Sequence, residues 1–347
     1  MEVEDFVRIR TERRLLQQIF WECTLRCNLN CLHCGSDCRK NDMPEDMPFE
    51  DFAKVLDEVS LAKDPSQILI VTTGGEPLVR KDIVDCGRAI TGRGFRWGMV
   101  SNGMLLTKPM LDELLDAGLV TIAISLDGFE DEHNWMRGNK ESFRRAVGAI
   151  KAIEEASRHR PLAWDVITCA NARNIGSLER FKDYLLSIGV SRWRIFSVFP
   201  LGRAADNADM QLSPEQFREL MQFVLKVRSS GEMRLSYSCE GYLGPYEMRL
   251  RDLPFFCGAG INVASVRYDG AISGCLSIRS HFDQGNIYKD SFMDVWNNRF
   301  EMYRDHEWMK TDACATCEVW KVCRGGAMHL RNEEGKMLSC SFLKLNS

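Results

Sequence analysis

Short apolar runs alternate with longer amphipathic segments along the first two-thirds of the chain. The apolar runs are rich in Val, Ile, Phe and Trp, which predicts buried strands at 19–24, 67–72, 95–101, 119–126, 163–169 and 192–199. The amphipathic segments between them predict helices at 50–63, 80–92, 108–117, 140–157 and 177–188. In the fourth segment the apolar residues recur at the spacing of one buried helix face, at Phe143, Val147, Ile150 and Ile153.

This alternation predicts the fold class. Short apolar strands joined by helices favour parallel pairing through right-handed crossovers. Six strands of this kind predict an α/β fold, a partial (β/α)6 barrel similar to a TIM barrel but short of the eight strands that close one. Active sites in such folds lie at the carboxyl ends of the strands, so motifs at those positions carry the most weight.

The pattern changes after the sixth strand. Residues 203–213 are polar and predict a loop, and Ser213 followed by Pro214 predicts the start of a helix over 214–230. We therefore expect four segments: an N-terminal extension at 1–18, the barrel at 19–213, a linker helix region at 214–256 and a cysteine-rich domain at 257–347.

Composition and charge exclude several classes of protein. The 347 residues are 45% apolar and 27% charged, as expected for a globular protein with a core. A net charge of −4 gives no bulk electrostatic reason to bind nucleic acid. No apolar run reaches the roughly 18 residues of a membrane-spanning helix, and the N-terminus lacks the apolar stretch of a secretory signal. We therefore expect a cytoplasmic protein without nucleic-acid or membrane partners.

Fourteen cysteines change the picture most. The cytosol keeps thiols reduced, so these residues indicate metal binding, reactivity or burial rather than disulfides. Five lie between residues 23 and 38, and six lie between residues 257 and 340. This distribution predicts two metal regions joined by a scaffold.

The first region contains a C-x3-C-x2-C motif directly after the first strand, formed by Cys27, Cys31 and Cys34. Iron–sulfur clusters usually take four cysteine ligands, so a set of three leaves one iron open to an outside ligand. Such an open position turns a metal site into a reaction site. The motif alone also fits a zinc site or buried thiols.

At this point the sequence resembles the radical S-adenosylmethionine (radical SAM) superfamily, whose hallmark is this motif after the first barrel strand. The resemblance implies that the three cysteines hold a [4Fe–4S] cluster that binds S-adenosylmethionine (SAM). It also implies that the segment after the second strand, Gly74, Gly75, Glu76 and Pro77, binds the amino group of SAM. Glycines would let the backbone approach the ligand closely, although a Gly-Gly pair also suits an ordinary turn.

Polar residues follow the third and fourth strands in the same way. In similar proteins such strand ends line the ribose and carboxylate of SAM, which here assigns that role to Ser101, Asn102, Ser125 and Asp127. Arg137 resembles a family arginine that approaches the SAM carboxylate. Each of these positions is also compatible with a simple turn.

The second region resembles the SPASM extension of radical SAM enzymes, which carries auxiliary iron–sulfur clusters. Cys314, Cys317 and Cys323 form C-x2-C-x5-C, and Cys340 completes a set of four thiolates. We expect one auxiliary [4Fe–4S] cluster there, with structural zinc as the alternative, since four thiolates suit either metal.

The chain departs from the SPASM pattern at one position. The next cysteine of the pattern is replaced by Ala327, and Arg251 lies near the place of an upstream cysteine. The second auxiliary site therefore keeps only Cys257 and Cys275, which leaves a degenerate site or an unusual cluster. Cys239 is a further candidate ligand, although nothing in the spacing indicates it. The remaining cysteines are expected to be small buried residues: Cys23, Cys38, Cys86, Cys169 and Cys239.

The resemblance implies an enzyme that cleaves SAM reductively to a 5′-deoxyadenosyl radical and abstracts a hydrogen atom from a substrate. We expect a peptide or protein substrate, with a small molecule such as a sugar, cofactor or haem precursor as the alternative. Leu276 after Cys275 disfavours an anaerobic sulfatase maturase, and fewer than about 20 residues precede the first strand, too few for a leader-recognition domain. An electron donor such as flavodoxin or ferredoxin is implied as a partner. A non-catalytic metal-binding protein is the alternative of another class.

Overall fold

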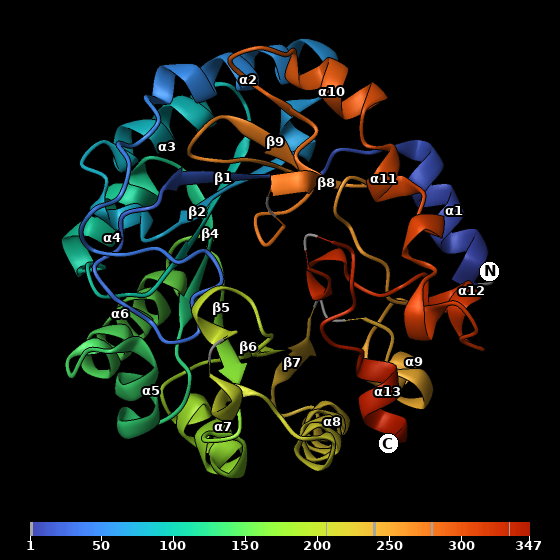
Figure 1. The fold of residues 1–347 in the computed structure, drawn as a ribbon. Coiled ribbons are helices and arrows are strands. Elements are labelled where there is room, and N and C mark those ends of the chain that lie inside the picture. Colours follow the sequence, from blue (N-terminus) through green and yellow to red (C-terminus); the bar gives the residue numbers. More distant parts are fainter. Residues whose placement is uncertain (1–2, 206, 239–240, 279, 333) are drawn as a thin grey trace.

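The computed structural model describes residues 3–205, 207–238, 241–278, 280–332 and 334–347. A single ten-stranded sheet runs through the described part of the chain in the order β10-β9-β8-β1-β2-β3-β4-β5-β6-β7. The sheet curves into an open ring with helices on its outer side (Figure 1).

The six predicted strands are confirmed, and all of them pair in parallel. They are β1 (Gln18–Thr24), β2 (Leu69–Gly74), β3 (Arg96–Ser101), β4 (Leu119–Ser125), β5 (Ala163–Ala170) and β6 (Arg192–Ser197). Their carboxyl ends lie at one edge of the sheet, where the predicted SAM-contacting segments begin, apart from Arg137, which lies in a helix after β4.

Among the described residues, the sheet nevertheless contains four strands that the sequence did not predict. β7 (Arg234–Tyr237) adds in parallel to β6, and β8 (Val263–Val266) adds in parallel to β1. β9 (Ala271–Ser273) and β10 (Gly285–Asn286) continue from β8 in antiparallel fashion. β7 and β8 are four residues each, too short to stand out as apolar runs in the sequence.

The crossover helices lie where the amphipathic segments predict them. They are α2 (Phe49–Ala62), α3 (Ile83–Gly92), α4 (Lys108–Asp116), α6 (Ser142–Ser157) and α7 (Leu178–Ser187). α8 (Pro214–Ser230) begins as expected: the Ser213 hydroxyl accepts a hydrogen bond from the Gln216 N–H, and the Gln216 side chain accepts one from the Ser213 N–H. This reciprocal capping fixes the first turn.

Other helices were not predicted from the pattern. α1 (Val3–Arg13) lies in the N-terminal extension, and α5 (Glu130–Arg137) lies between β4 and α6. The C-terminal part contributes short helices: α9 (Glu247–Leu250), α10 (Phe292–Asn298), α11 (Glu301–Arg304), α12 (Trp320–Cys323) and α13 (Ser341–Asn346). α12 lies beside α1, at the opposite end of the chain (Figure 1).

The core lies between the sheet and its outer helices. Trp21 of β1 stacks on Phe52 of α2 with ring centroids 4.5 Å apart, and both side chains are fully buried. On α6 the predicted face is confirmed at Val147, Ile150 and Ile153, which are buried. In the described residues, no helix combines the length and the apolar character needed to span a bilayer.

Candidate functional site

The three cysteines of the first motif lie in the loop between β1 and α2, at the carboxyl edge of the sheet. Cys31 is buried, and Cys27 and Cys34 are half-buried. The loop backbone is tied down at two places: the Cys27 N–H donates to the Arg39 carbonyl at 2.8 Å, and the Leu32 N–H donates to the Met136 carbonyl of α5 at 2.8 Å. The cysteines are therefore held by the fold before any ligand binds.

Arg203, which sequence reasoning assigned only to a loop, also holds this segment. Its Nε donates to the Cys31 carbonyl at 2.7 Å, although the two residues are 172 positions apart. Its backbone N–H donates to the Cys34 carbonyl at 3.1 Å, and its guanidinium also contacts the Cys38 carbonyl and the Asp37 carboxylate. Nothing in a single sequence signals a contact of this range.

The two glycines after β2 pack against the start of the cysteine loop. The Gly75 N–H donates to the Thr24 carbonyl at 2.8 Å. A Cβ atom on Gly75 would lie 2.1 Å from the Arg26 carbonyl oxygen, and one on Gly74, whose φ is +128°, would lie 2.2 Å from the Thr24 carbonyl oxygen. In this structure the close approach that requires glycine is therefore between two segments of the chain itself.

Glu76 joins the ends of β2 and β3. Its fully buried carboxylate accepts hydrogen bonds from the Ser101 hydroxyl at 2.8 Å, the Asn102 N–H at 2.7 Å and the Leu78 N–H at 3.2 Å. Burial raises the pKa of Glu76 to about 7, against the effect of these donors. Pro77 is buried and begins the short turn that follows.

Asn102 connects this carboxylate to the cysteine loop. Its Nδ2 donates to Oδ1 of Asn28 at 2.8 Å and lies 3.9 Å from the Cys27 sulfur. Ser125 ends β4 at the same edge and is half-buried. The ends of the second and third strands are thus linked by direct contacts to the first motif.

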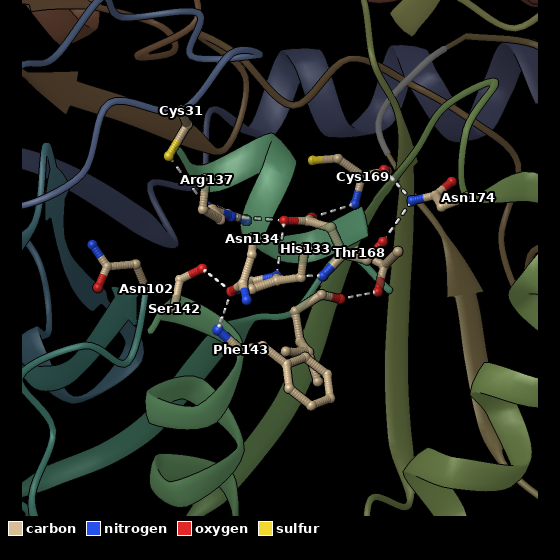
Figure 2. A network of polar contacts seen from close by, with 12 residues as sticks. Cys31, Asn102, His133, Asn134, Arg137, Ser142, Phe143, Thr168, Cys169 and Asn174 are labelled. Carbon is tan, nitrogen blue, oxygen red and sulfur yellow. Dashed lines mark hydrogen bonds and ion pairs between the residues drawn. The ribbon is translucent and has the colours of Figure 1, made fainter. Parts of the chain in front are cut away.

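Asp127 and Arg137 form a buried ion pair. Figure 2 shows the Arg137 side chain lying near Cys31 of the cysteine loop. Arg137 Nε donates to Asp127 Oδ2 at 2.7 Å, and its NH1 lies 3.8 Å from the Cys31 sulfur. Burial would raise the pKa of the Asp127 carboxyl, but the Arg137 charge and the His133 contact hold it well below its usual range. The Cys169 N–H also donates to this carboxylate, at 3.0 Å.

Cys169 belongs to this group, although the sequence assigned it no chemistry. It is half-buried in β5, and its sulfur, a ring nitrogen of His33 and an Asp127 oxygen all lie within 4.8 Å of one another. Of the other leftover cysteines, Cys23, Cys38 and Cys86 are buried as expected, so among the described ones Cys169 alone departs from that expectation.

Two buried donors near the first motif have no hydrogen-bond partner: His33 Nδ1 and Asn28 Nδ2. Orphaned donors in native structures call for an explanation such as a ligand. With three thiols, an amide and a guanidinium at one edge, the residues fit a negatively charged cluster with a polar ligand at its open iron.

Four of the six cysteines of the second region line one cavity: Cys314, Cys317, Cys323 and Cys340. Arg331 lies against it: its NH2 is 3.3 Å from the Cys314 sulfur, and it also donates to the Met309 and Gly335 carbonyls. Its side chain is buried, and the described residues offer it no carboxylate partner. Such a cation is stabilised when the neighbouring thiols ionise and bind metal.

Cys257 and Cys275, the two cysteines of the partial second auxiliary site, are both among the described residues. Burial raises the pKa of both Cys257 and Cys275. Ala327 is fully buried in an apolar cluster with Phe255 and Leu330, against which Cys257 packs. The position at which the family pattern has a cysteine thus lies beside Cys257. Cys239, the third ligand considered above, is outside the described residues.

Comparison with known families gives two matches. A model described as the radical SAM superfamily matches residues 21–185. A model named SPASM and described as an iron–sulfur cluster-binding domain matches residues 257–318.

Curated relatives cover most of the chain at modest identity. An AdoMet-dependent heme synthase of Methanosarcina barkeri is 27% identical and covers 88% of this chain and 90% of its own length. Mycofactocin maturase MftC of Mycolicibacterium smegmatis is 30% identical and covers 89% of this chain and 77% of its own length.

Solved structures agree in fold. A structure described as anSMEcpe with bound AdoMet has a TM-score of 0.74 at 15% identity, with 95% of each chain covered. Streptococcus suis SuiB bound to S-adenosylmethionine has a TM-score of 0.70 at 16% identity and covers 91% of this chain and 74% of its own.

Proposed function

Because this chain belongs to the radical SAM superfamily and carries a SPASM iron–sulfur domain, we propose that Cys27, Cys31 and Cys34 hold its SAM-binding [4Fe–4S] cluster. When bound, the cluster and SAM supply a 5′-deoxyadenosyl radical that abstracts a hydrogen atom from a substrate. The observation that carries the assignment is the convergence of Asn102 on Cys27 and of Arg137 on Cys31.

Different residues around the cysteines would bind different groups of SAM. Arg137 brings a buried positive charge to the carboxylate of SAM, and Asp127 orients it, because both Asp127 oxygens already accept hydrogen bonds from the chain. Glu76 holds Ser101 and Asn102 in place, and its ionised form would supply a negative charge to the ammonium of SAM.

The remaining predicted residues shape the same edge. Gly74, Gly75 and Pro77 let the turn after β2 pack on the cysteine loop, beside the proposed SAM site. We assign the ribose of SAM to Ser125, which is half-buried at the end of β4. A cytoplasmic location would keep all these thiols reduced.

We assign one auxiliary [4Fe–4S] cluster to Cys314, Cys317, Cys323 and Cys340. The four cysteines line one cavity, which supports a shared metal site. The SPASM match, described as an iron–sulfur cluster-binding domain, favours a cluster over zinc at this site.

For the substrate, the first candidate is a haem precursor. The heme synthase of M. barkeri covers 88% of this chain and 90% of its own length, so the two share nearly the whole fold. A porphyrin would offer carboxylates and C–H bonds to the residues at the carboxyl ends of the strands.

The second candidate is a peptide, as the sequence predicted. Mycofactocin maturase has the higher identity, 30%, over 89% of this chain. The fold is shared with a SuiB structure described as bound to its precursor peptide SuiA. The peptide assignment stays a prediction.

One experiment separates the two. The anaerobically reconstituted protein is incubated with dithionite, SAM and either iron coproporphyrin III or the short peptide encoded beside its gene, and products are analysed by mass spectrometry. A mass change of the porphyrin together with faster 5′-deoxyadenosine formation supports the haem-precursor assignment. Modification of the peptide alone contradicts it.

A further inference from the structure

A second cavity, of ≈ 530 Å³, lies between α1 and the C-terminal domain and opens to the surface. Three residues line both this outer cavity and the four-cysteine cavity: Trp320, Cys323 and Gly326. The proposed auxiliary cluster is therefore separated from the outer cavity by a single layer of side chains. α1 and α12, which carry part of its wall, lie side by side at the outside of the molecule (Figure 1).

The outer cavity has an excess of positive charge. Its lining contains five cationic side chains, Arg8, Arg304, Lys310, Lys321 and Arg324, and two carboxylates, Glu12 and Glu307. Both carboxylates are already paired, Glu12 with Arg8 at 3.1 Å and Glu307 with Arg324 at 3.7 Å.

Three cations remain without a carboxylate partner among the described residues: Arg304, Lys310 and Lys321. Lys310 and Lys321 are exposed, and Arg304 is half-buried and donates only to backbone carbonyls. Burial, together with the nearby charge of Arg14, lowers the pKa of Arg304 to about 10, so it is still charged near neutral pH. An incoming anionic surface would relieve this repulsion.

Trp320 lies between the charged surface and the cysteines. Lys310 and Arg324 lie over its ring at 5.7 and 6.0 Å from the centroid, and the indole itself is buried. The tryptophan is part of the wall that the two cavities share, and the cations above its ring form the outer face that a partner would contact.

We propose that this outer cavity is the docking surface for an acidic one-electron carrier protein that exchanges an electron with the auxiliary cluster. The proposal rests on the cluster assigned above to Cys323 and its three partners. One electron passes from the flavin hydroquinone of the carrier to the oxidised cluster, which leaves a flavin semiquinone and a cluster reduced by one electron. Weak electron-transfer complexes are steered by charge, which suits the cations without a described carboxylate partner that line this cavity.

The test uses the full chain with Cys27, Cys31 and Cys34 all changed to Ala, so that the auxiliary cluster is the remaining chromophore. An acidic flavodoxin in its hydroquinone form is mixed with this protein, and cluster reduction is followed by stopped flow at low and high salt. The paired substitution Lys310→Glu and Lys321→Glu is then introduced into this protein. We expect it to reduce the rate of cluster reduction at low salt at least tenfold and to flatten the dependence of that rate on salt.

The control is a charge-matched pair on other elements, Lys151→Glu with Lys289→Glu, which are exposed side chains far from the cavity lining. We expect this control pair to leave the low-salt rate of cluster reduction within twofold of the rate of the protein that carries the three cysteine changes alone. Equal effects of the two pairs overturn the proposal, because a general change of net charge would then explain the result.

A second measurement does not depend on electron transfer. A carbodiimide reagent joins lysine amines to carboxylates in contact, and mass spectrometry maps the joined residues in the complex with flavodoxin. Cross-links at Lys310 or Lys321 support the docking surface, and cross-links confined to other faces contradict it. Iron content and 5′-deoxyadenosine formation with dithionite, measured on the chain with all its cysteines, report on the proposed function separately.

Discussion

At the scale of single residues, several buried charged side chains surround the proposed cluster cysteines. Glu76, Asp127, Arg137 and Arg331 are all buried, and each lies within one or two contacts of a cysteine in the proposed clusters. Charges are removed from water only where partners offset the cost. For Arg331 the described partners are carbonyls and a sulfur, so a metal-bound thiolate completes its environment.

The raised pKa of Glu76 predicts a pH dependence of stability. Its pKa is 4.5 for an ordinary glutamate and about 7 here, so the folded protein holds this proton more tightly than the unfolded chain. The free energy of unfolding of the ligand-free protein should therefore fall by ~3 kcal/mol between about pH 4.5 and pH 7 through this group. Glu76→Gln removes that part of the slope in urea unfolding series; parallel pH profiles for variant and wild type would contradict it.

Arg331 should raise the reduction potential of the auxiliary cluster, because hydrogen bonds and positive charge near the sulfurs stabilise the reduced form. Arg331→Gln is expected to shift the midpoint to a more negative value in a redox titration followed by electron paramagnetic resonance. Arg299→Gln is the matched control, since Arg299 is exposed and paired with Asp290 in the same domain. An unchanged midpoint with full iron content would rule out this role.

At the scale of elements, sequence patterns predicted the repeated strands and helices of the barrel. They missed short elements and contacts between residues far apart in the chain. Apolar periodicity predicts β1 to β6 and the helices between them. The spacing of the cysteines predicts the metal regions. α5 was missed because its eight residues are mostly charged or polar, with an apolar contribution from Trp135 and Met136 alone. Arg203 and Arg331 were missed because their contacts with the cysteine regions depend on chain packing that no local pattern encodes.

The packing of the β2 turn on the cysteine loop can be tested with two glycines. Gly75→Ala would place a Cβ 2.1 Å from the Arg26 carbonyl, so the loop must shift and we expect loss of iron at the first site. Gly92→Ala in α3 meets no atom within 4 Å and should be neutral or stabilise the helix by up to ~1 kcal/mol. Iron analysis and thermal unfolding compare the two; full iron in the Gly75 variant would contradict the expectation.

At the scale of the whole molecule, the C-terminal region is part of the sheet. β8 pairs with β1 from Gln18↔Val263 to Trp21↔Val266, and β1 leads directly into the cysteine loop. The boundary drawn at residue 256 from the sequence therefore separates strands that share one sheet.

A chain ending at residue 256 should consequently fail to form the first site as well as the second. Removal of β8 exposes the edge of β1 and its buried side chains, which favours aggregation. Low recovery of soluble protein and the absence of reconstituted iron are expected. A truncated chain that binds about four iron atoms and unfolds cooperatively would show that the barrel is independent.

The central claim is that the cysteines of the first motif support cleavage of SAM. The most direct measurement is 5′-deoxyadenosine formed by the anaerobically reconstituted protein with dithionite and SAM, for the wild type and for the Cys27→Ala/Cys31→Ala/Cys34→Ala variant. We predict that the wild type forms 5′-deoxyadenosine with about eight iron atoms per chain, and that the variant keeps about four and forms none. Equal amounts from the two proteins, or none from the wild type with full iron, would contradict the claim.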